Sequence, residues 1–86
     1  MEAVTVSIVE DLSEVRESLE NLVRGSEDFL FLSAYPNAET AEKNIPLEQP
    51  QIVIMDINLP GISGIECIRK IKTYLPRYAI YDVHHF

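Results

Sequence analysis

The chain has 86 residues, which is enough for one small domain and too few for two. Fourteen acidic residues against seven basic ones give a formal charge of −7, and this balance argues against direct contact with nucleic acid or anionic membranes. One cysteine, Cys67, has no partner for an internal disulfide, and the sequence shows neither a signal peptide nor an apolar run of about 18 residues, so we expect a cytoplasmic protein with no membrane segment.

The first third of the chain combines a strand pattern with a helix pattern. Residues 3–9 are rich in valine and isoleucine, which is typical of a buried strand. Apolar residues then recur at helical spacing over residues 12–24, and this period predicts a helix that Gly25 ends. Four charged residues belong to the other side of that helix, where we expect solvent: Glu14, Arg16, Glu17 and Glu20.

The middle of the chain predicts a second strand and a weaker helix. The apolar residues 29–32 favour a strand, and the turn that follows leads to Asn37, which can cap a short helix that runs through Lys43. Pro46 and Pro50 then indicate a loop.

The remaining segments continue the alternation of strands and helices. Residues 51–57 are the most apolar segment and predict a third strand. A capping box at residues 63–66 opens a helix that Pro76 ends, and residues 78–83 predict a fourth strand. Strands that alternate with helices in this way indicate an α/β fold, with a parallel sheet, right-handed connections and helices on both faces.

Acidic residues follow two of the predicted strands. Glu10 and Asp11 come directly after the first strand, and Asp56 lies at the end of the third. Ligands of open α/β sheets bind beyond the carboxyl ends of the strands, so the acids converge if these two strands are neighbours. Close carboxylates repel one another unless a hard cation lies among them, and a phosphate donor brought to that cation could phosphorylate one of them. The pattern therefore predicts a magnesium-dependent phospho-aspartate site.

The acidic pair and the segment Met55–Gly64, with the sequence MDINLPGISG, together resemble the receiver domain of two-component response regulators. The resemblance covers roughly the first two thirds of that domain. It implies a flavodoxin-like three-layer αβα fold with strand order 2-1-3-4, truncated so that the fifth strand is missing and no effector domain follows. A role in transcription regulation would then need another chain or domain.

The resemblance also implies a role for each acidic residue. Asp56 would be the phosphoacceptor, phosphorylated by a histidine kinase in the presence of Mg²⁺. The magnesium ligands would be Asp11, Asp56 and the backbone carbonyl of Asn58, and Glu10 would act through water or from behind the direct ligands. No enzyme activity is implied beyond assistance with the protein's own phosphorylation and dephosphorylation.

Two landmarks of receiver domains have no match in this chain. These domains carry a Ser or Thr at the end of the fourth strand and a Lys at the end of the fifth, whereas Val83, His84 and His85 stand where the hydroxyl is expected. We therefore expect phosphorylation to be uncoupled from the usual conformational switch. The missing elements would also leave apolar surface uncovered, so we expect self-association, as a homo-oligomer, or marginal stability.

Other interpretations fit parts of the sequence. The chain could be a phosphorylation-independent interaction or dimerisation module, an inert receiver remnant. A magnesium phosphohydrolase is disfavoured, because Asn58 stands where a second acid is expected for acid catalysis. At the level of single residues, Asp56 could cap a turn, and Asp11 and Glu14 could accept hydrogen bonds from first-turn amides of the helix at residues 12–24.

Overall fold

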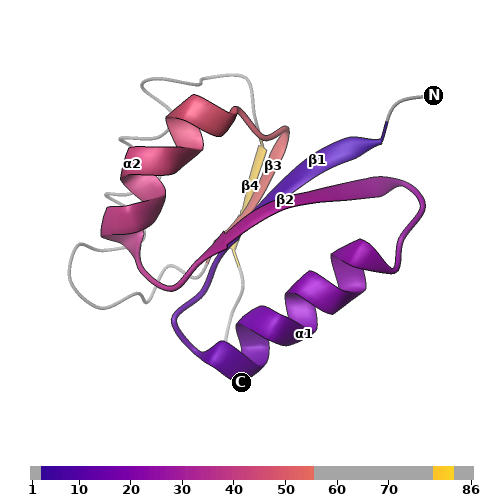
Figure 1. Cartoon of the computed structure of the whole chain (residues 1–86), viewed down its shortest axis with the longest axis horizontal. Helices are drawn as coiled ribbons and strands as arrows, with labels where there is room; N and C mark the ends of the chain where they lie inside the picture. The colour runs from indigo at the N-terminus through magenta and orange to yellow at the C-terminus, as the bar shows by residue number, and fades with distance from the viewer. Residues whose placement is uncertain (1–2, 56–78, 83–86) are drawn as a thin grey trace.

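The computed structural model describes residues 3–55 and 79–82, which form four strands and two helices (Figure 1). In chain order these elements are β1 (Val4–Val9), α1 (Ser13–Arg24), β2 (Phe29–Tyr35), α2 (Ala38–Glu48), β3 (Ile52–Met55) and β4 (Ala79–Asp82). The strands form one sheet with the order β2-β1-β3-β4, and every neighbouring pair is parallel. The predicted strand order is therefore confirmed.

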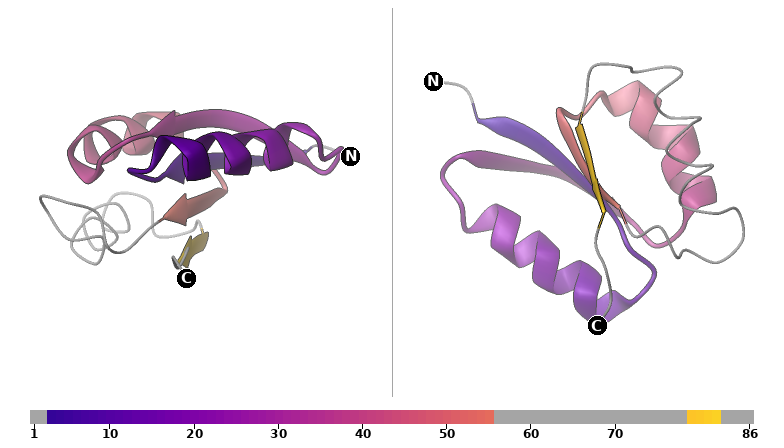
Figure 2. Two further views of the ribbon diagram at one scale, coloured as in Figure 1. Left: turned by 90° about the horizontal axis from the view of Figure 1, so that it is seen from below. Right: turned by 180° about the vertical axis from the view of Figure 1, so that it is seen from behind.

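The parallel register aligns the carboxyl ends of the strands. Val9 lies opposite Tyr35 on one side and Met55 on the other, and Met55 lies opposite Asp82. Figure 2 shows β4 next to β3, on the side of the sheet away from β2. The carboxyl ends of β1 and β3 thus lie at the same edge of the sheet.

One face of the sheet packs against α1 through apolar side chains. Successive strand residues point to opposite faces, so Val6 and Ile8 of β1 share this face and meet Val23 of α1. Five partly buried apolar residues from α1 and the strands pack around these three: Leu19, Phe31, Ala34, Ile52 and Ile54. The amphipathic pattern of residues 12–24 thus gives a helix whose apolar side covers β1 and β2.

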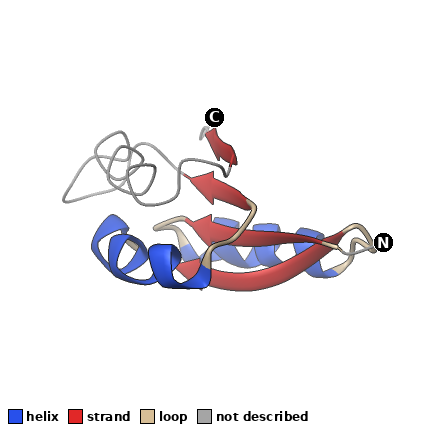
Figure 3. Ribbon diagram, turned by 90° about the horizontal axis from the view of Figure 1, so that it is seen from above, coloured by secondary structure: helices blue, strands red, loops and turns tan. Residues whose placement is uncertain are grey.

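The opposite face of the sheet packs against α2, and the views in Figures 1 and 3 place the two helices on either side of β1 and β2. The buried side of α2 carries two small residues and Ile45, which is fully buried. The strand residues of this face include Ser7, Val53 and Met55, and all three are fully buried.

A chain of hydroxyl hydrogen bonds crosses this α2 face. Ser33 Oγ donates to Glu48 Oε1 at 3.0 Å, and the hydroxyl of Tyr35 donates to the same oxygen. Ser7 Oγ lies 2.8 Å from Ser33 Oγ, and since Ser33 has already used its one hydrogen, Ser7 is the donor. We call these four residues, Ser7, Ser33, Tyr35 and Glu48, the hydroxyl network.

Two elements are longer than the sequence predicts. β2 continues past the predicted residues 29–32 to Tyr35, because Ser33, Ala34 and Tyr35 pair with the second half of β1. Leu32 is the extra residue of a bulge in β2 at this point.

The prediction of a loop around Pro46 is wrong, because α2 extends past Lys43 to Glu48 and contains this proline. Asn37 caps the start of α2 as predicted, since its side chain accepts a hydrogen bond from the backbone N–H of Thr40 at 2.8 Å. Burial of Ile45 offsets the helical hydrogen bond that Pro46 cannot donate.

The other predicted bounds agree with the structure or lie outside it. α1 ends at Gly25 as predicted, and β4 lies within the predicted residues 78–83. β3 confirms the predicted third strand as far as Met55, whereas residues 56–57 and the predicted helix that opens at residues 63–66 lie outside the described residues. Within the described parts of the chain, neither helix is long and apolar enough to cross a membrane.

Candidate functional site

Glu10 is fixed at the carboxyl end of β1. Its backbone N–H donates to the carbonyl of Tyr35 at 3.0 Å, so the pairing between β1 and β2 continues one residue past the strand. The side chain is fully buried, and Oε2 accepts a hydrogen bond from the backbone N–H of Leu12 at 3.1 Å. This carboxylate therefore lies inside the protein and shapes the turn between β1 and α1.

Asp11 differs from Glu10 in its exposure. It is partly exposed, and within the described residues its carboxylate makes no hydrogen bond. The alternative in which Asp11 caps α1 is not found, because the N-cap residue is Leu12 and, within the described residues, the Asp11 carboxylate accepts no hydrogen bond from the first turn. Glu14 lies in the first turn of α1 as expected, where its charge suits the helix dipole. The Asp11 carboxylate thus remains available to a cation.

Arg16 is part of this site, although its helical spacing predicts the solvent side of the helix. Its Nη1 donates to the backbone carbonyl of Glu10 at 2.9 Å and lies 3.4 Å from that of Asp11. Side chains of an α-helix lean towards its amino terminus, which brings a long residue in the first turn back over the preceding loop. The spacing of five residues after Asp11, combined with the length of arginine, is the signal that could have revealed this contact.

Asp56 and Asn58, the other residues of the predicted site, lie outside the described residues. Their neighbour Met55 is described, and its Cα is the register partner of Val9 on β1. Adjacent strands are about 4.8 Å apart, and Asp56 is bonded directly to Met55. The two strands that precede the predicted acids are therefore side by side, which is the condition for the acids to converge.

The described residues fit a magnesium site in their chemistry, although they cannot complete one. No group of three or more histidine, cysteine or acidic residues gathers within residues 3–55 and 79–82. Glu10 and Asp11 nevertheless place two carboxylates at the edge where Asp56 follows in sequence, and Mg²⁺ prefers oxygen ligands and needs only one or two carboxylates.

Tyr35 connects this edge of the sheet to the hydroxyl network. Its backbone carbonyl accepts the hydrogen bond from Glu10, and its hydroxyl donates to Glu48. Burial raises the pKa of the Tyr35 hydroxyl above its ordinary value of 10.0, and the hydrogen bond to Glu48 and the negative charge of Glu48 act in the same direction, whereas the neighbouring Ser33 hydroxyl lowers it. The hydroxyl therefore stays protonated at neutral pH.

Comparisons with known proteins agree on one family. Residues 6–83 match the model of the response regulator receiver domain. Over 73 residues the chain is 34% identical to protein-glutamate methylesterase/protein-glutamine glutaminase 2 of Paramagnetospirillum magneticum, and the alignment covers 85% of this chain and 21% of that protein. Over 67 residues it is 33% identical to the transcriptional regulatory protein YdfI of Bacillus subtilis, covering 78% of this chain and 32% of the relative. The chain thus spans a fifth to a third of these relatives.

A solved structure supports the same fold. The response regulator domain of Thermotoga maritima CheB superposes with a TM-score of 0.86 at 22% sequence identity, over 93% of this chain and 60% of the other. The prediction of a flavodoxin-like α/β fold is confirmed by this likeness and by the strand order.

Proposed function

This chain belongs to the response regulator receiver family, and we propose that Asp56 is its phosphoacceptor, which takes a phosphoryl group from a partner histidine kinase in a magnesium-dependent transfer. The observation that supports this proposal best is the pairing of Val9 with Met55. Because β1 and β3 are parallel neighbours, their carboxyl ends lie at the same edge of the sheet, and an acid follows each of them in sequence.

The donor set of the proposed metal site consists of oxygen atoms. Asp11, Asp56 and the backbone carbonyl of Asn58 would hold the ion, and Glu10 would act through water or from behind these ligands. The burial of Glu10 and its hydrogen bond from Leu12 suit this indirect role. When bound, Mg²⁺ would neutralise charge on the oxygens of the phosphoryl group.

The proposed transfer forms one bond and breaks one. A carboxylate oxygen of Asp56 attacks the phosphorus atom, and the bond between phosphorus and the imidazole nitrogen of the kinase phosphohistidine breaks, with its electron pair remaining on that nitrogen. The protein contributes alignment, since the strands fix the positions from which the acids extend. In this proposal the site assists only the phosphorylation and dephosphorylation of its own Asp56.

Mass spectrometry with acetyl phosphate as donor tests the phosphoacceptor. The parent protein should gain the mass of one phosphoryl group when Mg²⁺ is present and stay unmodified when it is chelated, and Asp56→Asn should gain none. Asp28→Asn is the matched control, because Asp28 is an exposed aspartate in the turn before β2 and should leave labelling unchanged. Labelling of Asp56→Asn at the level of the parent would reject Asp56 as the site.

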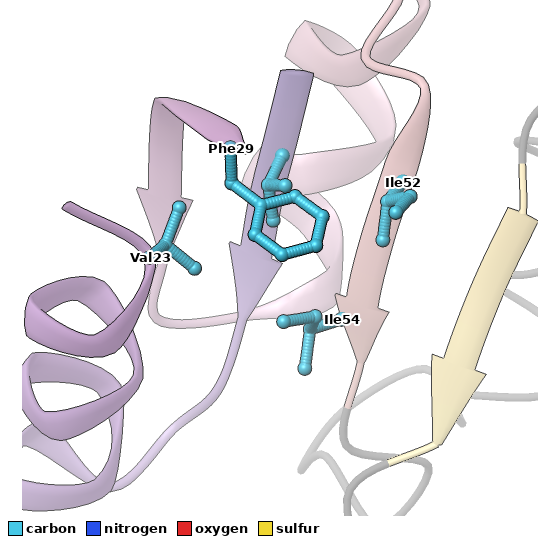
Figure 4. Close-up of a pocket in the computed structure, with 5 residues that line it drawn as sticks. Val23, Phe29, Ile52 and Ile54 are labelled. Carbon is cyan, nitrogen blue, oxygen red and sulfur yellow. The ribbon is translucent and has the colours of Figure 1, made fainter. Parts of the chain in front are cut away.

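A second function is favoured by an apolar pocket beside α1. Five residues line a cavity of about 300 Å³: Val6, Val23, Phe29, Ile52 and Ile54. Figure 4 shows the side chains of α1, β2 and β3 arranged around this space. Phe29 is 38% exposed, and Leu22 on α1 is 71% exposed. Because exposed apolar patches mark interfaces, we propose as the alternative that this face joins two copies of the chain independently of phosphorylation.

Light scattering tests this alternative. The parent should form dimers at micromolar concentration, and Phe29→Lys should shift the protein to monomers because it places a charge at the pocket. Leu47→Lys is the control, since Leu47 is 83% exposed on α2 and does not line the pocket. A parent that stays monomeric and unfolds cooperatively would count against self-association.

A further inference from the structure

We propose that Arg16 is a positioning residue that holds the acidic loop, residues 10–12, in the conformation that a bound cation needs. The inference rests on the proposed function, because it concerns the same magnesium site. Its basis is the pair of contacts from the Arg16 guanidinium to the backbone carbonyls of Glu10 and Asp11. Arg16 touches no reacting group in this proposal and acts through the two acidic residues.

Several hydrogen bonds hold the acidic loop. Arg16 supplies those that go to the backbone carbonyls of Glu10 and Asp11. The N–H of Glu10 is held by Tyr35, and the Glu10 carboxylate is held by the N–H of Leu12. The two carbonyls on the other side of the loop are contacted by Arg16. Removal of the guanidinium would therefore release the peptide units on either side of Asp11, the residue with the available carboxylate.

The residue type and its place on α1 support this role. Arginine carries five N–H donors in a rigid planar fork, so one side chain can serve two neighbouring carbonyls. A cation in the first turn of a helix is disfavoured by the helix dipole, which is positive at that end. Arg16 lies in this turn, and its backbone N–H donates to the carbonyl of Leu12 as the helix begins. The contacts to the acidic loop offset the unfavourable dipole.

Two effects of Arg16 on cation binding have opposite signs, which makes the proposal testable. As a positive charge near the site, the guanidinium repels Mg²⁺, so its removal should tighten binding. As a clamp on the loop, it preorganises the Asp11 carboxylate, so its removal should weaken binding. Loss of residues that orient metal ligands typically costs about 10- to 100-fold in affinity, and we therefore expect the clamp to dominate.

The experiment compares the parent with Arg16→Met and Arg16→Lys. Methionine keeps an unbranched stem and removes all donors, and lysine keeps the charge with a single ammonium group. Arg24→Met is the matched control, because Arg24 lies on the same helix eight residues further on, about 12 Å along its axis, and pairs with Glu20. Two quantities are measured by NMR without a phosphodonor: the dissociation constant for Mg²⁺ and the hydrogen exchange rate of the Leu12 amide.

We expect Arg16→Met to raise the dissociation constant for Mg²⁺ about tenfold, and Arg16→Lys to recover part of the loss. The Leu12 amide, which donates to Glu10, should exchange faster in Arg16→Met, while the amides of Val6 and Ile8 keep their protection because β1 stays paired. Arg24→Met should change neither the Mg²⁺ affinity nor the exchange at Leu12.

Three results would overturn the inference. Tighter Mg²⁺ binding by Arg16→Met would show that the charge dominates, and unchanged exchange at Leu12 would show that the loop does not depend on the guanidinium. Equal effects of Arg16→Met and Arg24→Met would indicate a general loss of stability. These failures differ from failure of the proposed function, in which the parent protein itself would bind no Mg²⁺ or would not be labelled at Asp56.

Discussion

The two faces of the sheet are completed in different ways. On the α2 face, Ile45 and the strand residues Val53 and Met55 are fully buried, and the hydroxyl network crosses the strands. On the α1 face, the buried contacts are apolar, the Arg24 guanidinium lies 4.5 Å from the centre of the Phe31 ring, and a cavity of about 300 Å³ remains between Val23 and Ile54. Within residues 3–55, the same sheet thus has one closed face, packed against α2, and one open face, which borders the cavity beside α1.

The two faces hold the strands through different kinds of interaction. Hydrogen bonds in the hydroxyl network require fixed donor and acceptor positions, whereas the hydrophobic effect has no preferred direction. Tyr35 belongs to that network, and its carbonyl anchors Glu10 at the site. The closed face is therefore connected to the candidate site through Tyr35, and the open face is the surface that the alternative proposal assigns to a second copy of the chain.

The largest expected effect is the loss of stability when a side chain of each face is shortened to alanine. Ile45→Ala should lower the free energy of unfolding by about 3 kcal/mol, because it removes a fully buried side chain and leaves a cavity in the closed face. Ile54→Ala should cost about 1–2 kcal/mol, since Ile54 is only partly buried and already lines a space. Urea unfolding followed by circular dichroism measures both, and equal losses would contradict the difference between the faces.

Addition of a methylene group makes the same comparison in the opposite direction. Val53→Ile should destabilise the protein by about 1 kcal/mol, because Val53 is fully buried on the closed face. Val6→Ile, on the neighbouring strand, should be neutral or stabilise by up to about 0.8 kcal/mol, since Val6 lines the pocket and the added group has room. Both substitutions keep a β-branched strand residue. Destabilisation of similar size at the two positions would show that the α1 face is as tightly packed as the α2 face.

The sequence predicts the fold further than it predicts the details of the site. The parallel α/β sheet and the bounds of α1 follow from alternation and helical period, because these patterns reflect which side chains must be buried, whereas the strand order is what the resemblance to receiver domains implies. The extension of α2 past Pro46 could not be predicted in the same way, since tertiary burial of Ile45 outweighs a local helix breaker.

At the site, the sequence pattern predicts the acids but not the contacts of Arg16 with them. Glu10 and Asp11 are visible in the sequence because they follow a strand, and the pairing of β1 with β3 supports their convergence with Asp56. Helical period alone predicts that Arg16 faces solvent. Its contacts go to backbone carbonyls, which every residue carries, so only the spacing of five residues after Asp11 and the length of the side chain point to them.

The hydroxyl network predicts a dependence of stability on alkaline pH. The pKa of Tyr35 is raised in the folded protein, so its protonated form is favoured by folding. The stabilisation is fully present below pH 10.0, the ordinary pKa, and is lost as the pH rises through the higher pKa of the folded state. Tyr35→Phe should cost about 0.5–1 kcal/mol at neutral pH through loss of the hydrogen bond to Glu48, and should lose less stability than the parent above pH 10.0.

Urea midpoints measured from pH 8 to 11 check this prediction. Glu48→Gln is a useful second variant, because it keeps an acceptor for the Tyr35 hydroxyl and removes the charge. Burial is the largest cause of the raised pKa, so Glu48→Gln should keep part of the alkaline loss. If Tyr35→Phe loses as much stability at alkaline pH as the parent does, groups other than Tyr35 cause the loss.

The smallest expected effect concerns the end of α2. Gln49 has φ of 53°, a left-handed conformation that favours glycine, and its N–H donates to the carbonyl of Ile45 at 2.9 Å. Gln49→Gly should stabilise the protein by about 0.5 kcal/mol, because relief of the left-handed strain exceeds the entropy that glycine loses on folding. Glu27→Gly is the control and should destabilise, since Gln49 is the one non-glycine residue with positive φ in the described part of the chain. If both glycine substitutions raise the stability, relief of the strain at Gln49 is not the cause of the increase. The helix tolerates this strain because Ile45, one turn earlier, is anchored in the closed face, so the packing of that face, more than the residue at the helix end, determines where α2 stops.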